Sequence, residues 1–216
     1  MGILTVPTAN PVQPEAVGLR HVTFATEPIA AQQLAIIAGE IQQITHEAEL
    51  QILSREKADL CVRLKEGSWC VAECLDHLTQ TTRSFLPTIS DAIANAPKLA
   101  SDRRLRTGIL PSLFIRNLNP PYRLRFKVLP KLTPRDVDAE TAWTDFVQSQ
   151  SQLLETVLSA AGLAIDRVTI QSPVYARISY NIYGAFRMLA AHQSRHIWQI
   201  GQILKALDGR SISVVA

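Results

Sequence analysis

Mostly apolar side chains recur at helical spacing along four long stretches of the chain. Segments with prolines and glycines separate these stretches. The first stretch follows Pro28, a residue suited to a first helical turn, and runs to about residue 52. The second spans about 70–96, the third about 136–160 before Gly162, and the fourth about 179–207 before Gly209. The positions that define the four stripes are, in chain order, Ile29, Leu34, Ile37, Ile41, Ile44, Ala48 and Ile52; Val71, Leu75, Leu78, Phe85, Leu86, Ile89 and Ile93; Ala142, Phe146, Ser149, Leu153, Val157 and Ala160; and Phe186, Leu189, Gln193, His196, Ile200, Ile203 and Leu207.

Four amphipathic helices without alternating strands predict an all-α fold, a four-helix bundle. The connection over 98–135 contains five prolines and no long helical period, so we expect a long crossover between helices two and three, with a short helix near 110–117. Pro87 lies inside the second stretch, where it predicts a kink or a break. The predicted organisation is an extended N-terminal arm over 1–27, the bundle over 28–208 and a C-terminal tail over 209–216.

Composition agrees with one globular domain. Of 216 residues, 47% are hydrophobic and 19% are charged, which excludes a collagen-like or wholly disordered chain. Three cysteines in a chain of this length do not make a disulfide framework. No run of 18 apolar residues is present, and the first Lys or Arg is Arg20, so neither a transmembrane helix nor a signal peptide is expected. We therefore expect a cytoplasmic protein without a membrane partner.

The five histidines carry the candidate chemistry. His192 and His196 are four residues apart, so both lie on one face of the fourth helix, about 70° and 30° from the centre of its apolar stripe. Two imidazoles at this spacing can bind one metal ion, and His77 on the second helix is the candidate third ligand. His77 lies about 130° from the centre of its own stripe, which suits the mouth of a cavity. The alternative is three unrelated histidines; His21 and His46 show no pattern that indicates a role.

Two motifs resemble a known family. Trp69-Cys70-Val71-Ala72-Glu73-Cys74-Leu75-Asp76-His77-Leu78 and Ala191-His192-Gln193-Ser194-Arg195-His196-Ile197-Trp198-Gln199 are similar to the second and closing helices of the DinB-like (YfiT-like) superfamily. The resemblance covers about 28–208. It implies a four-helix bundle that binds a divalent ion such as zinc or nickel through three histidines. Carried onto this sequence, those ligands are His77, His192 and His196.

One position departs from the family pattern. The family commonly has Ser where Cys70 stands, so that a Ser-x-x-Glu capping box forms with Glu73. Cys is a poorer cap, and helix two could start less firmly or use Ser68. Cys70, Cys74 and His77 also share one helical face within about 60°, which leaves a Cys–Cys–His site open beside the simpler interpretation of small buried thiols.

Three neutral ligands would leave a coordination position open and the full charge of the ion uncompensated, so the pKa of a bound water or thiol would fall. Two reaction classes would use such an ion: hydrolysis by metal-bound hydroxide, and transfer of a metal-activated thiolate to an electrophile. The resemblance favours thiol transferases or isomerases that use low-molecular-weight thiols. The partners expected are a small-molecule substrate and a second copy of the chain in a homodimer. A non-catalytic metal-binding or stress-response module is the alternative. Glu73 and Tyr183 are candidate neighbours of the ligands, with capping and core packing as their alternatives.

The net charge of +3 hides an uneven distribution. Residues 98–135 hold ten basic side chains and one acid, a net +9, whereas the other 12 basic and 18 acidic side chains give −6. Such a segment would attract anionic substrates, with Arg123, Arg125 and Lys127 as candidate contacts. Nucleic-acid binding is a weaker alternative because no nucleic-acid motif is present. A solvated loop, or one paired with acidic helix faces, is the simplest interpretation.

Overall fold

The structure, a computed structural model, describes residues 27–119 and 128–215, and side chains as far as residue 209. Helices make up most of it, which confirms the all-α prediction. The elements are α1 (Ile29–Ile52), a 3-10 turn (Asp59–Cys61), α2 (Val71–Ala94), α3 (Ile109–Leu118), a second 3-10 turn (Pro130–Leu132), α4 (Ala139–Ser159), β1 (Thr169–Gln171), β2 (Ser179–Asn181) and α5 (Ile182–Val215). The predicted arm over 1–27 lies almost wholly outside the described residues.

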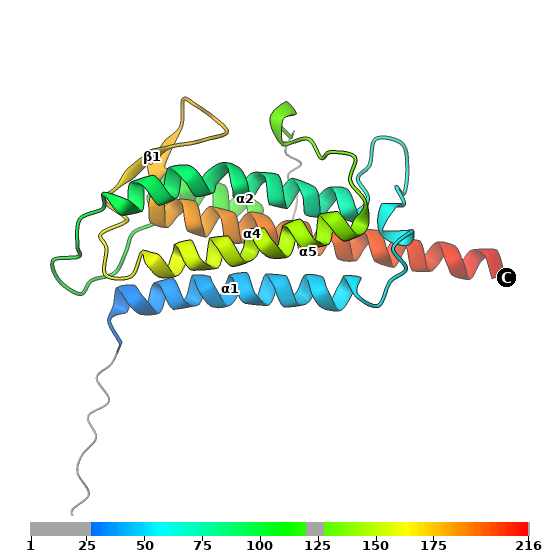
Figure 1. The fold of residues 1–216 in the computed structure, drawn as a ribbon, viewed down its shortest axis with the longest axis horizontal. Coiled ribbons are helices and arrows are strands. Elements are labelled where there is room, and N and C mark those ends of the chain that lie inside the picture. Colours follow the sequence, from blue (N-terminus) through cyan, green and yellow to red (C-terminus); the bar gives the residue numbers. More distant parts are fainter. Residues whose placement is uncertain (1–26, 120–127, 216) are drawn as a thin grey trace, which may run out of the picture.

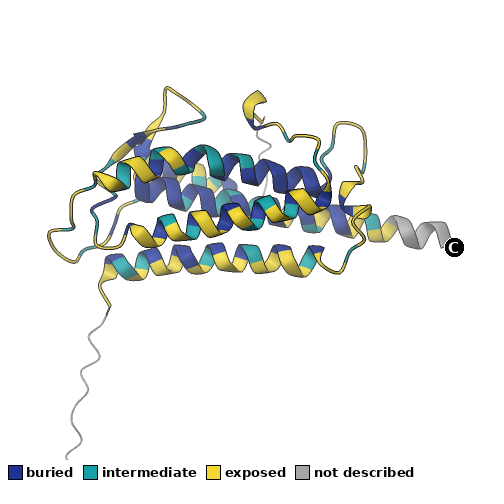
Figure 2. Ribbon diagram, in the orientation of Figure 1, coloured by how far each residue is buried: buried dark blue, intermediate teal, exposed yellow. Residues whose placement is uncertain are grey.

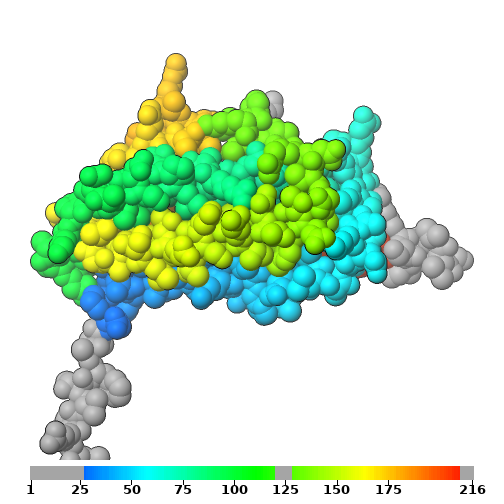
Figure 3. Space-filling model, in the orientation of Figure 1, coloured from blue at the N-terminus to red at the C-terminus, as the bar shows by residue number. Residues whose placement is uncertain are grey.

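The four long helices pack so that α1 and α2 each contact both α4 and α5. On the face shown in Figure 3, α4 lies between α2 and α1. Colours along the chain in Figure 1 show that α2 and α4 run in one direction and α1 and α5 in the other. Side-chain pairs agree, since Asp76 lies beside Arg135 and Arg83 beside Asp145. Because α2 ends at Ala94 and the parallel helix α4 begins at Ala139, the chain returns along the bundle between them, which agrees with the predicted long crossover between helices two and three.

The apolar stripes form the core. Every predicted stripe position on α1 is buried except Ile29, which is 46% exposed at the start of the helix. Figure 2 shows buried faces turned toward the bundle interior and exposed faces outward on α1 and α4. Burial of such a stripe holds each helix in place, because most of the stability of a helix within a protein comes from the packing of its apolar face. Within the described residues, no helix combines the length and apolarity that crossing a bilayer requires.

Three local expectations differ from the structure. Pro87 does not break α2, which continues to Ala94, because buried neighbours such as Phe85 and Ile89 hold the helix on both sides of the lost backbone hydrogen bond. The predicted kink stays a prediction. The fourth stretch becomes helical only at Ile182, since residues 179–181 pair with β1 and the Asn181 side chain accepts the Gly184 N–H at 2.7 Å. Gly209 does not end α5, which runs to Val215 through the predicted tail.

The structure also shows how α4 ends and how α2 begins. Gly162, after α4, has a φ of +75°, as expected of a glycine that ends a helix. Helix α2 begins directly after Cys70, and the Glu73 carboxylate accepts the Cys70 backbone N–H at 2.9 Å. Both halves of the capping box are therefore present with Cys in place of Ser, since the Cys70 side chain also accepts from the Glu73 backbone N–H. Ser68 does not cap α2, because its hydroxyl donates to the Lys65 carbonyl.

Candidate metal centre

Three histidines from two helices converge inside the bundle. His77 lies on α2, and His192 and His196 lie one turn apart on α5, which packs against α2. One ring nitrogen from each lies within 4.8 Å of the other two. The imidazole rings of His192 and His196 are 4.6 Å apart, and each ring lies within about 5 Å of the His77 ring. The three histidines identified by spacing thus form one group.

A backbone carbonyl orients the first of these rings. Nδ1 of His77 lies 2.8 Å from the carbonyl oxygen of Leu132, and because a carbonyl only accepts, Nδ1 carries the proton. The lone pair is then on Nε2, which faces Nε2 of His192 at 3.3 Å. A hydrogen bond from the remote ring nitrogen to a carbonyl is the usual way a metal-binding histidine is held.

The other two histidines have unmet hydrogen-bonding capacity. Within the described part of the chain, Nδ1 of His192 and Nδ1 of His196 are buried without a hydrogen-bond partner. An unpaired buried polar atom costs about 1–3 kcal/mol, and such atoms in native proteins are few. Three imidazoles whose nitrogens lie this close together, in a site where two ring nitrogens have no hydrogen-bond partner, could bind a metal ion.

The protonation states also suit a cation. Burial lowers the pKa of His77, against the opposing effect of its hydrogen bond to Leu132. Burial, with the neighbouring His77 and Arg195, lowers the pKa of His192 to about 3, and burial lowers the pKa of His196 well below its usual value. All three rings are therefore neutral at pH 7, the form in which imidazole binds a metal.

The position of His77 differs from the sequence prediction. Its spacing from the apolar stripe put it at a cavity mouth, but it is only 3% exposed. The end of the crossover covers it, through the Leu132 carbonyl and through Thr133, whose carbonyl accepts from Gln80. Helical spacing within α2 could not show this, because the covering residues lie 55 positions away.

Asp76 fastens that covering segment to α2. Its carboxylate is 1% exposed and accepts from the Arg135 backbone N–H at 2.7 Å and from Nε of the Arg135 guanidinium at 3.0 Å. The pair holds residues 129–138 against α2 and with them the carbonyl of Leu132. In the sequence, the one sign of this role is that Asp76 is an acid directly before a candidate ligand.

Trp69 borders the histidine group. Its ring lies 4.9 Å from that of His77 and stacks on that of His196 at 6.0 Å with 21° between the planes. The side chain is half-buried. Helical spacing gives no sign of this contact, because Trp69 lies before the start of α2 and reaches a residue on α5.

The remaining predicted neighbours have other contacts in the structure. Glu73 pairs with Arg63 and with the start of α2, a capping arrangement. The hydroxyl of Tyr183 accepts from the Gln33 side chain at 3.0 Å, and its ring packs in the core. A role for either residue beside the histidine ligands stays a prediction.

The cysteines do not join the group. His77 gathers with His192 and His196 rather than with Cys70 and Cys74, both of which are buried free thiols. Burial raises the pKa of Cys70 to about 11 and raises the pKa of Cys74 as well. Both thiols are therefore protonated at pH 7, whereas metal ligation uses the thiolate, so the structure favours the simpler interpretation of packed thiols.

Some basic side chains of the segment 98–135 form ion pairs with acidic side chains. Arg103 forms two hydrogen bonds to Asp166, at 2.7 and 2.9 Å, and Arg135 pairs with Asp76. Arg123, Arg125 and Lys127, the predicted substrate contacts, lie outside the described residues.

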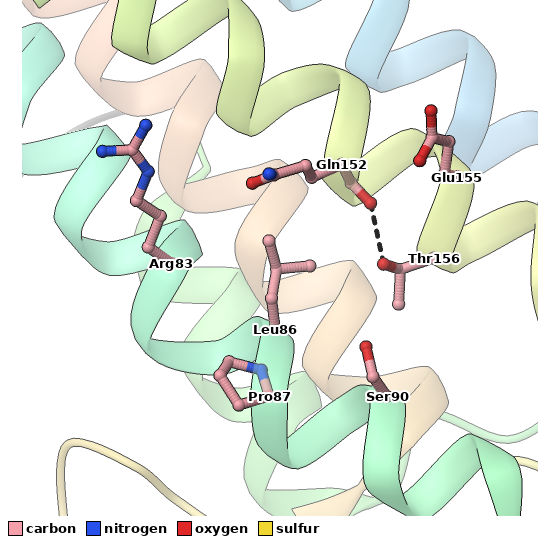
Figure 4. Close-up of a pocket in the computed structure, with 7 residues that line it drawn as sticks. All are labelled: Arg83, Leu86, Pro87, Ser90, Gln152, Glu155 and Thr156. Carbon is pink, nitrogen blue, oxygen red and sulfur yellow. Dashed lines mark hydrogen bonds between the residues drawn. The ribbon is translucent and has the colours of Figure 1, made fainter.

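Two shallow cavities lie away from the histidines. One, of about 370 Å³, opens between α2 and α4, and Figure 4 shows the side chains that line it. These are Arg83, Leu86, Pro87, Ser90, Gln152, Glu155 and Thr156. The other, of about 390 Å³, is lined by residues of α3 and α5 and by Thr107 and Asn119. Neither lining includes a histidine, so neither cavity belongs to the candidate metal site.

Comparison with known proteins agrees with the two sequence motifs. The family model described as the DinB superfamily matches residues 41–200, a range that includes all three histidines. No curated protein and no solved structure matches the chain.

Proposed function

The chain belongs to the DinB superfamily, and from this and its buried histidine group we propose that it is a divalent-metal-dependent enzyme acting on a small molecule, with His77, His192 and His196 as the metal ligands. The observation that carries the proposal is the convergence of three neutral imidazoles, two of which, His192 and His196, have a buried Nδ1 without a hydrogen-bond partner. Zinc and nickel are the proposed ions, since both accept imidazole ligands.

A divalent ion held by three neutral ligands keeps its full charge and lowers the pKa of a bound thiol or water. The protein's own residues prepare the site for this chemistry. Burial keeps the rings neutral, the Leu132 carbonyl orients His77, and Trp69 shields one side of the group from water. Thiol transfer to an electrophile, with a low-molecular-weight thiol as substrate, is the proposed reaction class; hydrolysis is the second.

Metal content tests the first half of the proposal. Protein made in medium supplied with zinc and nickel should retain about one ion per chain after desalting. His192→Ala should lose it, and His46→Ala should retain it, because His46 is exposed on α1 beside Glu49. Wild-type protein without metal under these conditions would show the proposal to be wrong.

Substrate turnover tests the second half. Wild-type protein is incubated with a panel of low-molecular-weight thiols and alkylating or epoxide electrophiles, and thiol loss is followed. We expect consumption that stops after metal removal and returns on reloading. A metal-loaded protein that transfers no thiol but hydrolyses ester or amide substrates would favour the second reaction class.

A further inference from the structure

A second polar group lies in the bundle core beside the histidines. Each of the four long helices contributes one side chain to it: Thr45 from α1, Thr82 from α2, Gln150 from α4 and Gln193 from α5. Thr82, Gln150 and Gln193 are at most 3% exposed. We call these four residues the glutamine network.

The two amides of the glutamine network are fully used as donors. Gln193 Nε2 donates to Gln150 Oε1 at 2.7 Å and to Thr82 Oγ1 at 3.1 Å. Gln150 Nε2 donates to Gln193 Oε1 at 3.2 Å and to Thr45 Oγ1 at 3.3 Å. Each amide NH₂ has two hydrogens, so every amide N–H in the group has an acceptor.

Such a group fits one alignment of the helices. A shift of α5 by one turn, about 5.4 Å, would separate Gln193 from both acceptors and leave buried N–H groups unpaired. An apolar side chain in the same place would tolerate many alignments, since apolar packing has no direction. Buried polar groups are known to set helix register in this way.

The alignment that the glutamine network selects is the one the histidines need. Gln193 directly follows His192 on α5, and Thr82 lies five residues after His77 on α2. The hydrogen bond between Gln193 and Thr82 therefore joins the two helices beside the point where their ligands meet.

We propose that Gln193 and Thr82 are positioning residues, which hold α5 against α2 so that His192 and His196 meet His77. The proposal rests on the metal site proposed above. Gln150 completes the hydrogen bonding of Gln193 and joins α4 to α5, whereas Thr45 accepts only from Gln150 and joins α1 to α4. Neither α1 nor α4 carries a ligand. Positioning groups around a metal site typically affect affinity by about 10–100-fold.

The test compares two threonines of the same network. Thr82→Val and Thr45→Val each remove one hydroxyl acceptor from a glutamine amide with little change of shape. For each purified variant, zinc affinity is measured by competition with a chromophoric chelator, the absorption spectrum of the Co²⁺-loaded protein is recorded, and thermal unfolding of the metal-free protein is followed.

We expect Thr82→Val to weaken zinc binding by about 10-fold and to alter the Co²⁺ spectrum. Thr45→Val should stay within about twofold of wild type, because α1 and α4 hold no ligand. Equal weakening by both variants, or an unchanged affinity and spectrum in Thr82→Val, would overturn the proposal.

A double variant keeps the proposal testable if Thr82→Val fails to fold. Gln150→Met with Gln193→Met replaces both amides by side chains of similar length, and removing both partners of a buried hydrogen bond is often close to neutral for stability. We expect unfolding near the wild-type temperature together with weaker zinc binding and an altered Co²⁺ spectrum. Wild-type affinity in this variant would overturn the positioning role alone, whereas a wild type that binds no metal would overturn the metal site itself.

Discussion

The metal-free protein should lose stability in mild acid, and His192 should account for a measurable share of the loss. The native His192 ring has a pKa of about 3, mainly through burial, whereas an unfolded histidine titrates near 6.5. Above pH 6.5 both states are neutral and the ring has no effect. As the pH falls below 6.5 the unfolded chain binds a proton that the native chain does not, so the free energy of unfolding falls until about pH 3.

The magnitude follows from this interval. From pH 6.5 to pH 5 the native ring stays neutral, and each pH unit is worth about 1.4 kcal/mol, so His192 alone lowers the free energy of unfolding by about 2 kcal/mol at pH 5. His77 and His196 also have lowered pKa values and add to the loss in the same direction. A loss of this size is a sizeable fraction of the stability of an ordinary domain.

Urea unfolding of chelator-treated protein at pH 7 and pH 5 measures the effect. We expect the loss between the two pH values to be about 2 kcal/mol smaller in His192→Gln than in wild type. His46→Gln, which changes an exposed histidine on α1, is the matched control and should behave as wild type. Equal losses in wild type and His192→Gln would refute the assignment of His192 as a buried neutral ring.

Further predictions concern two glycine substitutions and the reactivity of the three thiols. Gly184→Ala should destabilise the protein by about 1–3 kcal/mol in urea unfolding, because a Cβ there would lie 2.6 Å from the Thr107 carbonyl oxygen. Gly39→Ala, on α1 with nothing within 4 Å, should stabilise it by about 0.5–1 kcal/mol, and a Gly184→Ala variant as stable as wild type would contradict the close approach. At pH 8 a disulfide reagent should titrate one thiol rapidly in the native protein, the exposed Cys61, and all three after unfolding; rapid reaction of three native thiols would show that the other two are not buried.

Local patterns in the sequence were sufficient for the helices. Apolar spacing identified the four long helices because each helix buries one continuous face, and residues three or four apart in the sequence form that face. The same local information failed at Ser179, where pairing with residues eight to twelve positions earlier draws 179–181 into a strand, and at Gly209, where the helix continues.

The sequence by itself determined that His192 and His196 lie together, because they share one helix and their four-residue spacing fixes their common face, and it made His77 a candidate third member. Only the tertiary structure brought His77 to the pair. Only the tertiary structure decided that His77 is buried, that the Leu132 carbonyl orients it, and that Trp69 borders it. The same holds for the glutamine network, whose members come from four different helices. Each of these contacts joins residues far apart in the chain. They depend on how the helices align, which helical periodicity within one segment cannot encode.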